Sequence, residues 1–222
     1  MVAGDEAVLR RSPDAPDLLR LHEAVATLFA TQGDWRRAYQ HLRSALDIAR
    51  DGSLRDALTS SYNRRYLDER LSGPFADRQP GPLGIALVDL DRFKRVNDTY
   101  GHLVGDRVLR RVADLLQEKL PPDGFCARYG GEEFVLWLPG VDAGHAVEIV
   151  DAARVRVARH PWSELQPGLR VTISAGLAHE GSGAPARQLR SADDLLYAAK
   201  RAGRNKVAYQ GAQSTRLITH SE

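Results

Sequence analysis

The first fifty residues carry two runs of apolar side chains at helical spacing. Residues 1–16 are polar and contain two prolines, so we expect a flexible N-terminus there. Apolar residues then recur every three or four positions over residues 18–29 and again over residues 35–49, with a break at Gln32-Gly33-Asp34. This pattern predicts two amphipathic helices that form a hairpin over residues 17–52.

The hairpin resembles a single tetratricopeptide repeat, a helix-turn-helix unit of about 34 residues. The resemblance lies in its turn and in the residues that follow it: Gly33-Asp34-Trp35, Ala38, Leu42 and Ala45. One repeat cannot bury both of its faces by itself. Arrays of such repeats therefore usually need about three units to be stable. The hairpin therefore suits part of a longer array, a dimerisation element or a surface for a protein partner. Two ordinary helices packed on the next domain are the alternative.

After a connector at residues 51–53, which a helix could also cross, the pattern changes to that of a mixed α and β domain. Residues 83–90 form an almost wholly apolar run after a loop rich in Pro and Gly, which is typical of a strand buried on both faces. An amphipathic segment then predicts a helix. Beyond it, two short strands at residues 125–129 and 134–138 flank Gly130-Gly131 as a β-hairpin.

The last third of the chain predicts a helix, a strand and a final helix. Asp142 can cap a helix that runs to about Arg159, and residues 169–178 alternate as a strand. Ser191-Ala192-Asp193-Asp194 resembles a capping box, which indicates the start of a helix that ends at Gly203.

Together these elements predict an α+β domain over residues 53–209, with a mainly antiparallel sheet flanked by helices. Residues 210–222 lack apolar periodicity, and we expect a disordered tail there.

Composition narrows the classes of function that this domain could serve. The chain has 31 basic and 29 acidic side chains, a formal charge of +2, which gives no support for a nucleic-acid-binding surface. Cys126 is the only cysteine, so an internal disulfide and a cysteine-rich metal site are excluded. The sequence contains no apolar run of about 18 residues and predicts no membrane span, and we expect a cytoplasmic protein.

Two features place carboxylates where they could bind a cation. Asp89 comes at the end of the apolar strand, where a carboxylate is costly unless it is hydrated, paired or bound to a cation, although helix capping would also explain it. Glu132 and Glu133 follow the Gly-Gly turn, which on its own is more often a solvated loop tip. Together these oxygens suit a hard cation such as Mg²⁺, the usual partner of nucleotide phosphates.

From about Asp56 to Tyr209 the chain resembles the GGDEF-domain diguanylate cyclases. The motifs occur in that family's order and spacing: Asp56-Ala57-Leu58-Thr59, Asn63-Arg64-Arg65, Asp89-Leu90-Asp91-Arg92-Phe93-Lys94, Asn97-Asp98-Thr99-Tyr100-Gly101-His102, Tyr129-Gly130-Gly131-Glu132-Glu133-Phe134 and the segment from Lys200 to Lys206.

The resemblance implies a domain like the polymerase palm and the nucleotide cyclases. Such a domain binds one GTP and two metal ions, Mg²⁺ or Mn²⁺ in its place, and a homodimer condenses two GTP into cyclic di-GMP and two pyrophosphates. Carried over to this sequence, Asp89 and Glu132 would bind metal through carboxylates and Leu90 through its carbonyl oxygen. Glu133 would be a further catalytic acid, either as a metal partner or as an aid to deprotonating the attacking 3′-hydroxyl.

The resemblance also implies a guanine site. Asn97 and Asp106 match the family's guanine readers, and an amide with a carboxylate can meet the donors and acceptors of a guanine edge. Phe93 and Leu109 would line the base pocket, although core packing alone would explain Leu109, which lies on an apolar helix face.

The phosphates would be bound by cations and by the start of a helix. Arg92, Phe93 and Lys94 open a short helix whose free backbone N–H groups would hold the terminal phosphates. Lys200 and Arg204 match two cations that clamp phosphate oxygens, with a solvated basic helix end as the alternative.

The sequence departs from the family pattern in two places. Leu58-Thr59 is followed by Ser60-Ser61-Tyr62, where Gly-Leu is frequent. Many members also carry an inhibitory Arg-x-x-Asp site, but residues 121–124 are Pro-Pro-Asp-Gly, so we expect no such site here. Relatives that make mixed cyclic dinucleotides have serine in place of Asp106, so the aspartate favours two guanines.

Two other classes of function stay open at this level. The domain could sense GTP or cyclic di-GMP without turnover, although every implied metal and base residue is present. Alternatively, the hairpin could be a scaffold while the cyclase is idle.

Overall fold

The computed structural model describes residues 15–72, 81–180, 184–211 and 214–218. The chain divides into two compact units between Arg55 and Asp56. The expected flexible N-terminus falls almost wholly outside the described residues. Among the described helices, none is long and apolar enough to cross a membrane.

The first unit is the predicted helical hairpin. Helix α1 spans Ala15–Thr31 and helix α2 spans Trp35–Ser53, so α2 continues through the connector at residues 51–53. Asp34 caps α2, because its Oδ1 accepts a hydrogen bond of 3.2 Å from the Arg37 backbone N–H. The buried apolar residues of the hairpin are small: Ala26, Ala38 and Ala45. The two helices can therefore pack closely, and several of their larger apolar side chains are exposed: Leu21, Leu28, Trp35, Tyr39, Leu42 and Leu46.

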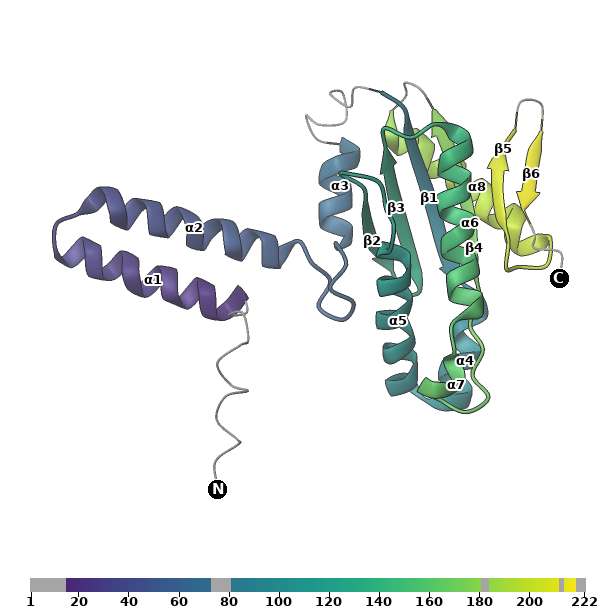
Figure 1. Ribbon diagram of the computed structural model, residues 1–222, viewed down its shortest axis with the longest axis horizontal. Coiled ribbons are helices and arrows are strands. Elements are labelled where there is room, and N and C mark those ends of the chain that lie inside the picture. The colour runs from purple at the N-terminus through teal and green to yellow at the C-terminus, as the bar shows by residue number, and fades with distance from the viewer. Residues whose placement is uncertain (1–14, 73–80, 181–183, 212–213, 219–222) are drawn as a thin grey trace. The chain divides into compact units, whose positions relative to one another are not determined.

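The second unit is an α+β domain with a six-stranded sheet in the order β2-β3-β1-β4-β5-β6 (Figure 1). Every neighbouring pair is antiparallel except β4 and β5, which confirms the mainly antiparallel sheet. In chain order the elements are α3 Arg64–Ser72, β1 Leu83–Leu90, α4 Phe93–Tyr100, α5 His102–Gln117, β2 Phe125–Gly130, β3 Glu133–Pro139, α6 Ala143–Arg159, α7 Trp162–Leu165, β4 Ile173–Glu180, α8 Pro185–Arg201, β5 Val207–Gln210 and β6 Thr215–Ile218.

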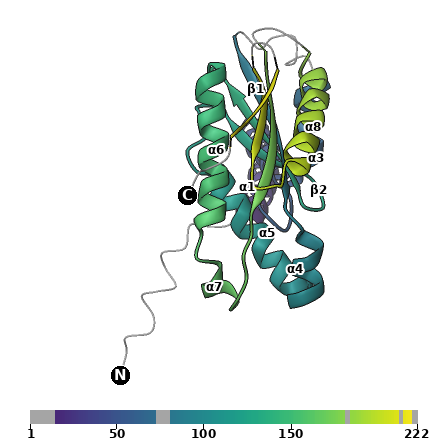
Figure 2. The same ribbon diagram turned by 90° about the vertical axis from the view of Figure 1, so that its right-hand side faces the viewer.

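Helices cover both faces of this sheet (Figure 2). On one face, Ala86, Val88 and Leu90 of β1 share a core with apolar residues of α4, α5 and α6. On the other face, Ile85 and Leu87 pack in a second core that includes residues of α3 and α8. All eight residues of β1 are buried, as the apolar run predicts for a central strand.

The structure corrects two predictions in the C-terminal third. Helix α8 begins at Pro185, so the predicted start at residues 191–194 was wrong. Proline suits the first turn of a helix, and the buried Gln188 fixes this turn by donating to the Leu83 carbonyl at 3.3 Å.

The predicted disordered tail contains a strand. Residues 215–218 form β6, which pairs with β5 along the edge of the sheet. Three of its four side chains are exposed, so the strand is held mainly by backbone hydrogen bonds and leaves no apolar period in the sequence.

Candidate active site

Three acidic residues lie together at the end of the central strand. Asp89 is the next-to-last residue of β1 and stands opposite Glu133 of β3 in register. Glu132 belongs to the two-residue turn between β2 and β3, where Gly130 pairs with Glu133 and Gly131 takes a left-handed φ of 48°. The Leu90 N–H donates to the Glu132 carbonyl at 3.3 Å, which fixes the turn against β1. The fold thus brings together acids that are more than forty positions apart.

The pKa of each of these carboxyls lies above its ordinary value. Burial is the main cause in all three, and only 8% of the Asp89 surface is exposed. The negative charge of Asp89 raises the pKa of Glu132 and of Glu133 further. Ionised acids at this point therefore repel one another, and a cation that approaches them is stabilised.

Lys200, in the last turn of α8, is the cation that meets Asp89. Its Nζ lies 2.8 Å from Asp89 Oδ2. The ammonium group lowers the pKa of Asp89, but burial outweighs it. One lysine cannot neutralise three carboxylates, so the site retains a negative charge that favours a further cation.

Within the described ranges, no group of three or more His, Cys, Asp or Glu side chains is arranged to hold a metal ion by itself. The metal ligands expected from the sequence are two carboxylates, those of Asp89 and Glu132, and the Leu90 carbonyl oxygen. They contain fewer than three such side chains, so their absence from this finding is no contradiction. A hard cation bound there would take further oxygens from phosphate groups. The raised pKa values and the hard oxygen donors suit Mg²⁺.

A second cluster lies between α4 and α5. The Asn97 Oδ1 atom is buried and has no hydrogen-bond partner. Gly105 of α5 lies directly over it, and a Cβ atom there would collide with Asn97 Oδ1 and come within 3.2 Å of Phe93 Cζ. A buried acceptor without a donor is costly, so this position suits a ligand that donates an N–H group. Asp106, the neighbour of Gly105, is half-buried.

The other expected substrate residues fall into two sets. Phe93 and Leu109 are buried within the main core, so packing accounts for both side chains whether or not they also line a base pocket. Arg92, Lys94 and Arg204 are exposed. Arg92 precedes α4 in a left-handed conformation, and the positive charge of Arg204 contributes to lowering the pKa of Asp89.

The structure also shows two positioning residues that the sequence reasoning did not assign. Arg128 of β2 donates to the Gly131 carbonyl at 3.0 and 2.8 Å and pairs with Asp56 at 3.1 Å. Partial burial alone would raise the pKa of Asp56, but hydrogen bonds from Thr59 and Arg128 hold it below its ordinary value. This ion pair fixes the turn that carries Glu132.

Asp91 is the second positioning residue. Its carboxylate accepts hydrogen bonds from Ser174 Oγ at 2.6 Å, Thr172 Oγ1 at 2.7 Å and the Asn205 N–H at 3.0 Å. Asn205 in turn accepts from the buried Arg154 at 2.9 Å. Asp91 therefore ties β4 and the turn after α8 to the end of β1, which positions Lys200 and Arg204 next to the acids.

Comparison with known proteins agrees with this fold. The family model "Diguanylate cyclase, GGDEF domain" matches residues 53–206, and the chain belongs to this family. It is 41% identical over 167 residues to the diguanylate cyclase DgcP of Pseudomonas aeruginosa, and 37% identical over 188 residues to the response regulator PleD of Caulobacter vibrioides. These matches cover 74% and 82% of this chain but only 25% and 41% of those proteins.

Solved structures show the same architecture. The coiled coil and GGDEF domain of DgcB from Caulobacter crescentus, in complex with c-di-GMP, matches 83% of this chain and all of that one, at a TM-score of 0.70 and 32% identity. The diguanylate cyclase SiaD of Pseudomonas aeruginosa, in complex with its activator SiaC, matches 86% of this chain and 75% of that one, at a TM-score of 0.68 and 32% identity.

Proposed function

We propose that this chain is a diguanylate cyclase, which condenses two GTP into cyclic di-GMP and two pyrophosphates. The observation that carries the proposal is the group of Asp89, Glu132 and Glu133 at the end of β1, where Asp89 stands opposite Glu133 and the Leu90 N–H holds the turn that carries Glu132. Family membership and the buried, unpaired Asn97 Oδ1 support it. The test is incubation of the full chain with GTP and Mg²⁺, followed by chromatography of the products.

In the proposed reaction the 3′-oxygen of one GTP attacks the α-phosphorus of another. A bond forms between these atoms, the bond from that phosphorus to the pyrophosphate oxygen breaks, and the hydroxyl proton leaves. The step occurs twice, so two pyrophosphates are released. Asp89, Glu132 and the Leu90 carbonyl would hold Mg²⁺, which when bound lowers the pKa of the hydroxyl and neutralises phosphate charge.

The residues of this chain then have separate roles. Glu133 either assists metal binding or accepts the proton of the attacking hydroxyl. Lys200 lies against Asp89 in the free protein, and Lys200 and Arg204 would contact the phosphate oxygens once GTP is bound. Arg92 and Lys94 flank the first N–H groups of α4, which would receive the terminal phosphates.

The cluster between α4 and α5 would bind guanine, with Asn97 and Asp106 reading its polar edge. Replacing Gly105 with Ala is expected to weaken GTP binding at least about tenfold, because the new Cβ collides with Asn97 Oδ1. Calorimetric titration with GTP and Ca²⁺ measures this effect. Gly144→Ala on α6, where the added Cβ meets only Asp142 Oδ1 at 3.3 Å, is the control. Unchanged affinity in Gly105→Ala would show that the base binds elsewhere.

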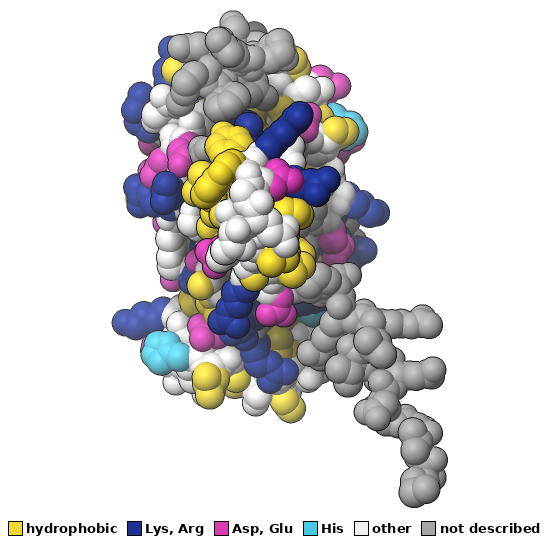
Figure 3. Space-filling model, turned by 90° about the vertical axis from the view of Figure 1, so that its left-hand side faces the viewer, with side chains coloured by type: hydrophobic (Ala, Val, Ile, Leu, Met, Phe, Trp, Pro, Cys, Tyr) yellow, Lys and Arg dark blue, Asp and Glu magenta, His cyan; other side chains and the backbone are white. Residues whose placement is uncertain are grey.

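Each chain would bring one GTP, so catalysis would require a second copy. The hairpin supports this, because α2 exposes four large apolar residues at spacings of four, three and four: Trp35, Tyr39, Leu42 and Leu46. Trp35 is 70% exposed and Leu46 68%, and Figure 3 shows hydrophobic side chains at the surface of the face that it views. This spacing is that of a helix seam that packs against a like helix. The tetratricopeptide-like character of the hairpin and its use by another protein partner stay predictions.

Feedback inhibition through the loop before β2 is not expected. In the segment from Pro121 to Gly124, the Gly124 N–H bonds to the Pro121 carbonyl at 2.9 Å, and a Cβ on Gly124 would lie 2.9 Å from that oxygen. An aspartate at position 124 therefore does not fit this turn. Titration of the enzyme with cyclic di-GMP should show no tight non-competitive inhibition. Inhibition of that kind which is lost in Asp123→Asn would contradict the expectation.

Removing one acid should stabilise the metal-free protein at neutral pH. Burial and Asp89 raise the pKa of Glu132 in the folded state, so its ionisation opposes folding above that pKa. Glu132→Gln is therefore expected to raise the Tm at pH 7.5 by about 2 °C. The gain should disappear as the pH falls below about 4, where the glutamate is protonated in the folded and unfolded states alike.

Thermal unfolding in EDTA at several pH values measures this difference. The exposed Glu148→Gln on α6 is the control and should be close to neutral. A Tm for Glu132→Gln at or below that of the parent at pH 7.5 would mean that the acids do not repel one another.

A further inference from the structure

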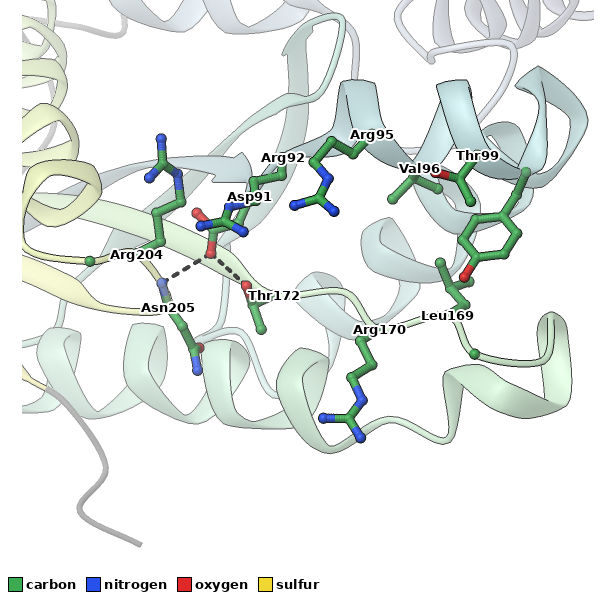
Figure 4. Close-up of a pocket in the computed structure, with 13 residues that line it drawn as sticks. Asp91, Arg92, Arg95, Val96, Thr99, Leu169, Arg170, Thr172, Arg204 and Asn205 are labelled. Carbon is green, nitrogen blue, oxygen red and sulfur yellow. Dashed lines mark hydrogen bonds between the residues drawn. The ribbon is translucent and has the colours of Figure 1, made fainter.

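A pocket of about 440 Å³ lies next to the candidate active site and is rich in arginine. Three segments line it: the start and one face of α4, residues 168–172 before β4, and the turn at residues 203–205 after α8. Figure 4 shows the side chains of Arg92 and Arg95 on the α4 side, and that of Arg170 across from them. Arg204 lies near Asp91 in the same view, and its charge acts on Asp89.

None of the four guanidinium groups forms an ion pair with an acidic side chain in the described parts of the chain, although the charge of Arg204 acts on Asp89 at a longer distance. The ion pairs among residues 15–72, 81–180, 184–211 and 214–218 do not include Arg92, Arg95, Arg170 or Arg204. Among the described residues that line the pocket, Asp91 alone has a carboxylate, and hydrogen bonds from Thr172, Ser174 and Asn205 already occupy it. Four positive charges around one cavity repel one another, so the pocket favours a ligand with several negative charges.

The pocket is separate from the proposed guanine site. The lining residues at positions 92, 95, 96, 99 and 100, of which the first precedes α4 and the others belong to it, follow the spacing of one helix face. Phe93 and Asn97 lie on a different face, where Gly105 of α5 covers them. The floor contains Val96 and Leu169, which are buried in the core, and Asp91 holds the surrounding segments in place. The pocket is therefore attached to the core and to the hydrogen bonds of Asp91.

The pocket also adjoins the place where the reaction would release its leaving group. Arg92 and Arg204 belong both to the proposed phosphate site and to the pocket lining, whereas Arg95 and Arg170 belong to the pocket alone. Arginine forks bind phosphate oxygens in pairs, and the Thr99 and Tyr100 hydroxyls could donate to others. A diphosphate is small enough for this volume and carries several charges at neutral pH.

We propose that the arginine pocket binds a diphosphate group, and that its ligand is the pyrophosphate released from GTP. The identity of the ligand rests on the proposed function, but the binding of a diphosphate does not. Pyrophosphate would pass from Arg92 and Arg204 to Arg95 and Arg170, which clears the reacting centre. Pyrophosphate in solution would then occupy the same pocket and slow the reaction.

Calorimetric titration of the full chain with sodium pyrophosphate tests the proposal. EDTA in the buffer removes any metal that could hold pyrophosphate at the acids. The parent should bind pyrophosphate, and the double variant Arg95→Gln/Arg170→Gln should bind it at least tenfold more weakly. The double variant Arg65→Gln/Arg190→Gln, which removes the same charge from exposed helix positions outside the pocket, should stay within about twofold of the parent.

Two further titrations show whether the pocket binds free pyrophosphate or the phosphates of GTP. With GTP and Ca²⁺ as the probe, Arg95→Gln/Arg170→Gln should bind like the parent, while Asn97→Ala should lose GTP and keep pyrophosphate. An equal loss of GTP and pyrophosphate in the arginine variant would assign the pocket to the substrate and overturn the proposal. So would a parent that does not bind pyrophosphate, or an equal loss in the control variant. If the parent binds as expected but makes no cyclic di-GMP, the proposed function fails and the diphosphate site stands.

Discussion

Replacing Glu133 with Gln is expected to lower the rate of cyclic di-GMP formation at least about 100-fold, and Asp89→Asn should have a similar effect. Both changes keep the shape of the side chain and remove the charge that a metal or a proton would require. Each variant leaves two carboxylates in place of three at the end of β1, so less negative charge remains there to hold a cation. Product formation from GTP and Mg²⁺, followed by chromatography, gives the rates.

Asp193→Asn is the matched control for these variants. Asp193 is exposed on α8, and its charge acts on Glu133, but it has no proposed role in the reaction. Its rate should stay within about twofold of the parent. If Glu133→Gln were no slower than Asp193→Asn, charge alone would account for both, and Glu133 would have no catalytic role.

Replacing Gly176 with Ala is expected to destabilise the catalytic domain by about 3 kcal/mol. Gly176 lies in β4 beneath α8, and a Cβ atom there would collide with the Ala192 carbonyl oxygen and the Leu196 N–H nitrogen. These are backbone atoms in the middle of a helix, so no side-chain rotation relieves the contact. The helix would have to move away from the sheet, and Lys200 at its end would move with it.

Urea unfolding followed by circular dichroism measures the loss of stability. Gly144→Ala, in the first turn of α6, is the control and should be neutral or slightly stabilising, since alanine favours helix over glycine. The rate of cyclic di-GMP formation should fall in Gly176→Ala even at temperatures where the domain is folded. A variant as stable as the parent would mean that α8 does not pack this closely on β4.

The sequence predicts the fold well where burial is continuous. The bounds predicted for strand β1 match its eight residues in the structure. A short apolar run between Pro-rich and acidic segments is typical of a strand buried on both faces. Asp142 was found as a cap because its side chain accepts from the His145 N–H at 2.9 Å, a bond between near neighbours. Such local signals are visible in one sequence.

The start of α8 and the edge strand β6 could not be predicted in the same way. Ser191-Ala192-Asp193-Asp194 has the composition of a cap, but Gln188 and Pro185 are buried against the sheet, so tertiary packing decides where the helix begins. Strand β6 depends on its neighbour β5 for its hydrogen bonds.

In the candidate site, too, residues in local motifs could be predicted, whereas contacts between distant segments could not. The acidic residues were predicted because they stand in compact motifs. Arg128 and Asp56, 72 positions apart, and the network around Asp91 depend on contacts between distant segments, so no local pattern shows them. The arginine pocket is the extreme case, because Arg95, Arg170 and Arg204 are exposed residues from three separate segments.

Mass balance of the GTP reaction tests the central proposal most directly. The full chain is incubated with GTP and Mg²⁺ over a range of protein concentrations, and cyclic di-GMP and pyrophosphate are both quantified. We expect one cyclic di-GMP and two pyrophosphates for every two GTP consumed, with a rate that rises faster than linearly with protein concentration. Binding of GTP without formation of cyclic di-GMP at any concentration would contradict the proposal.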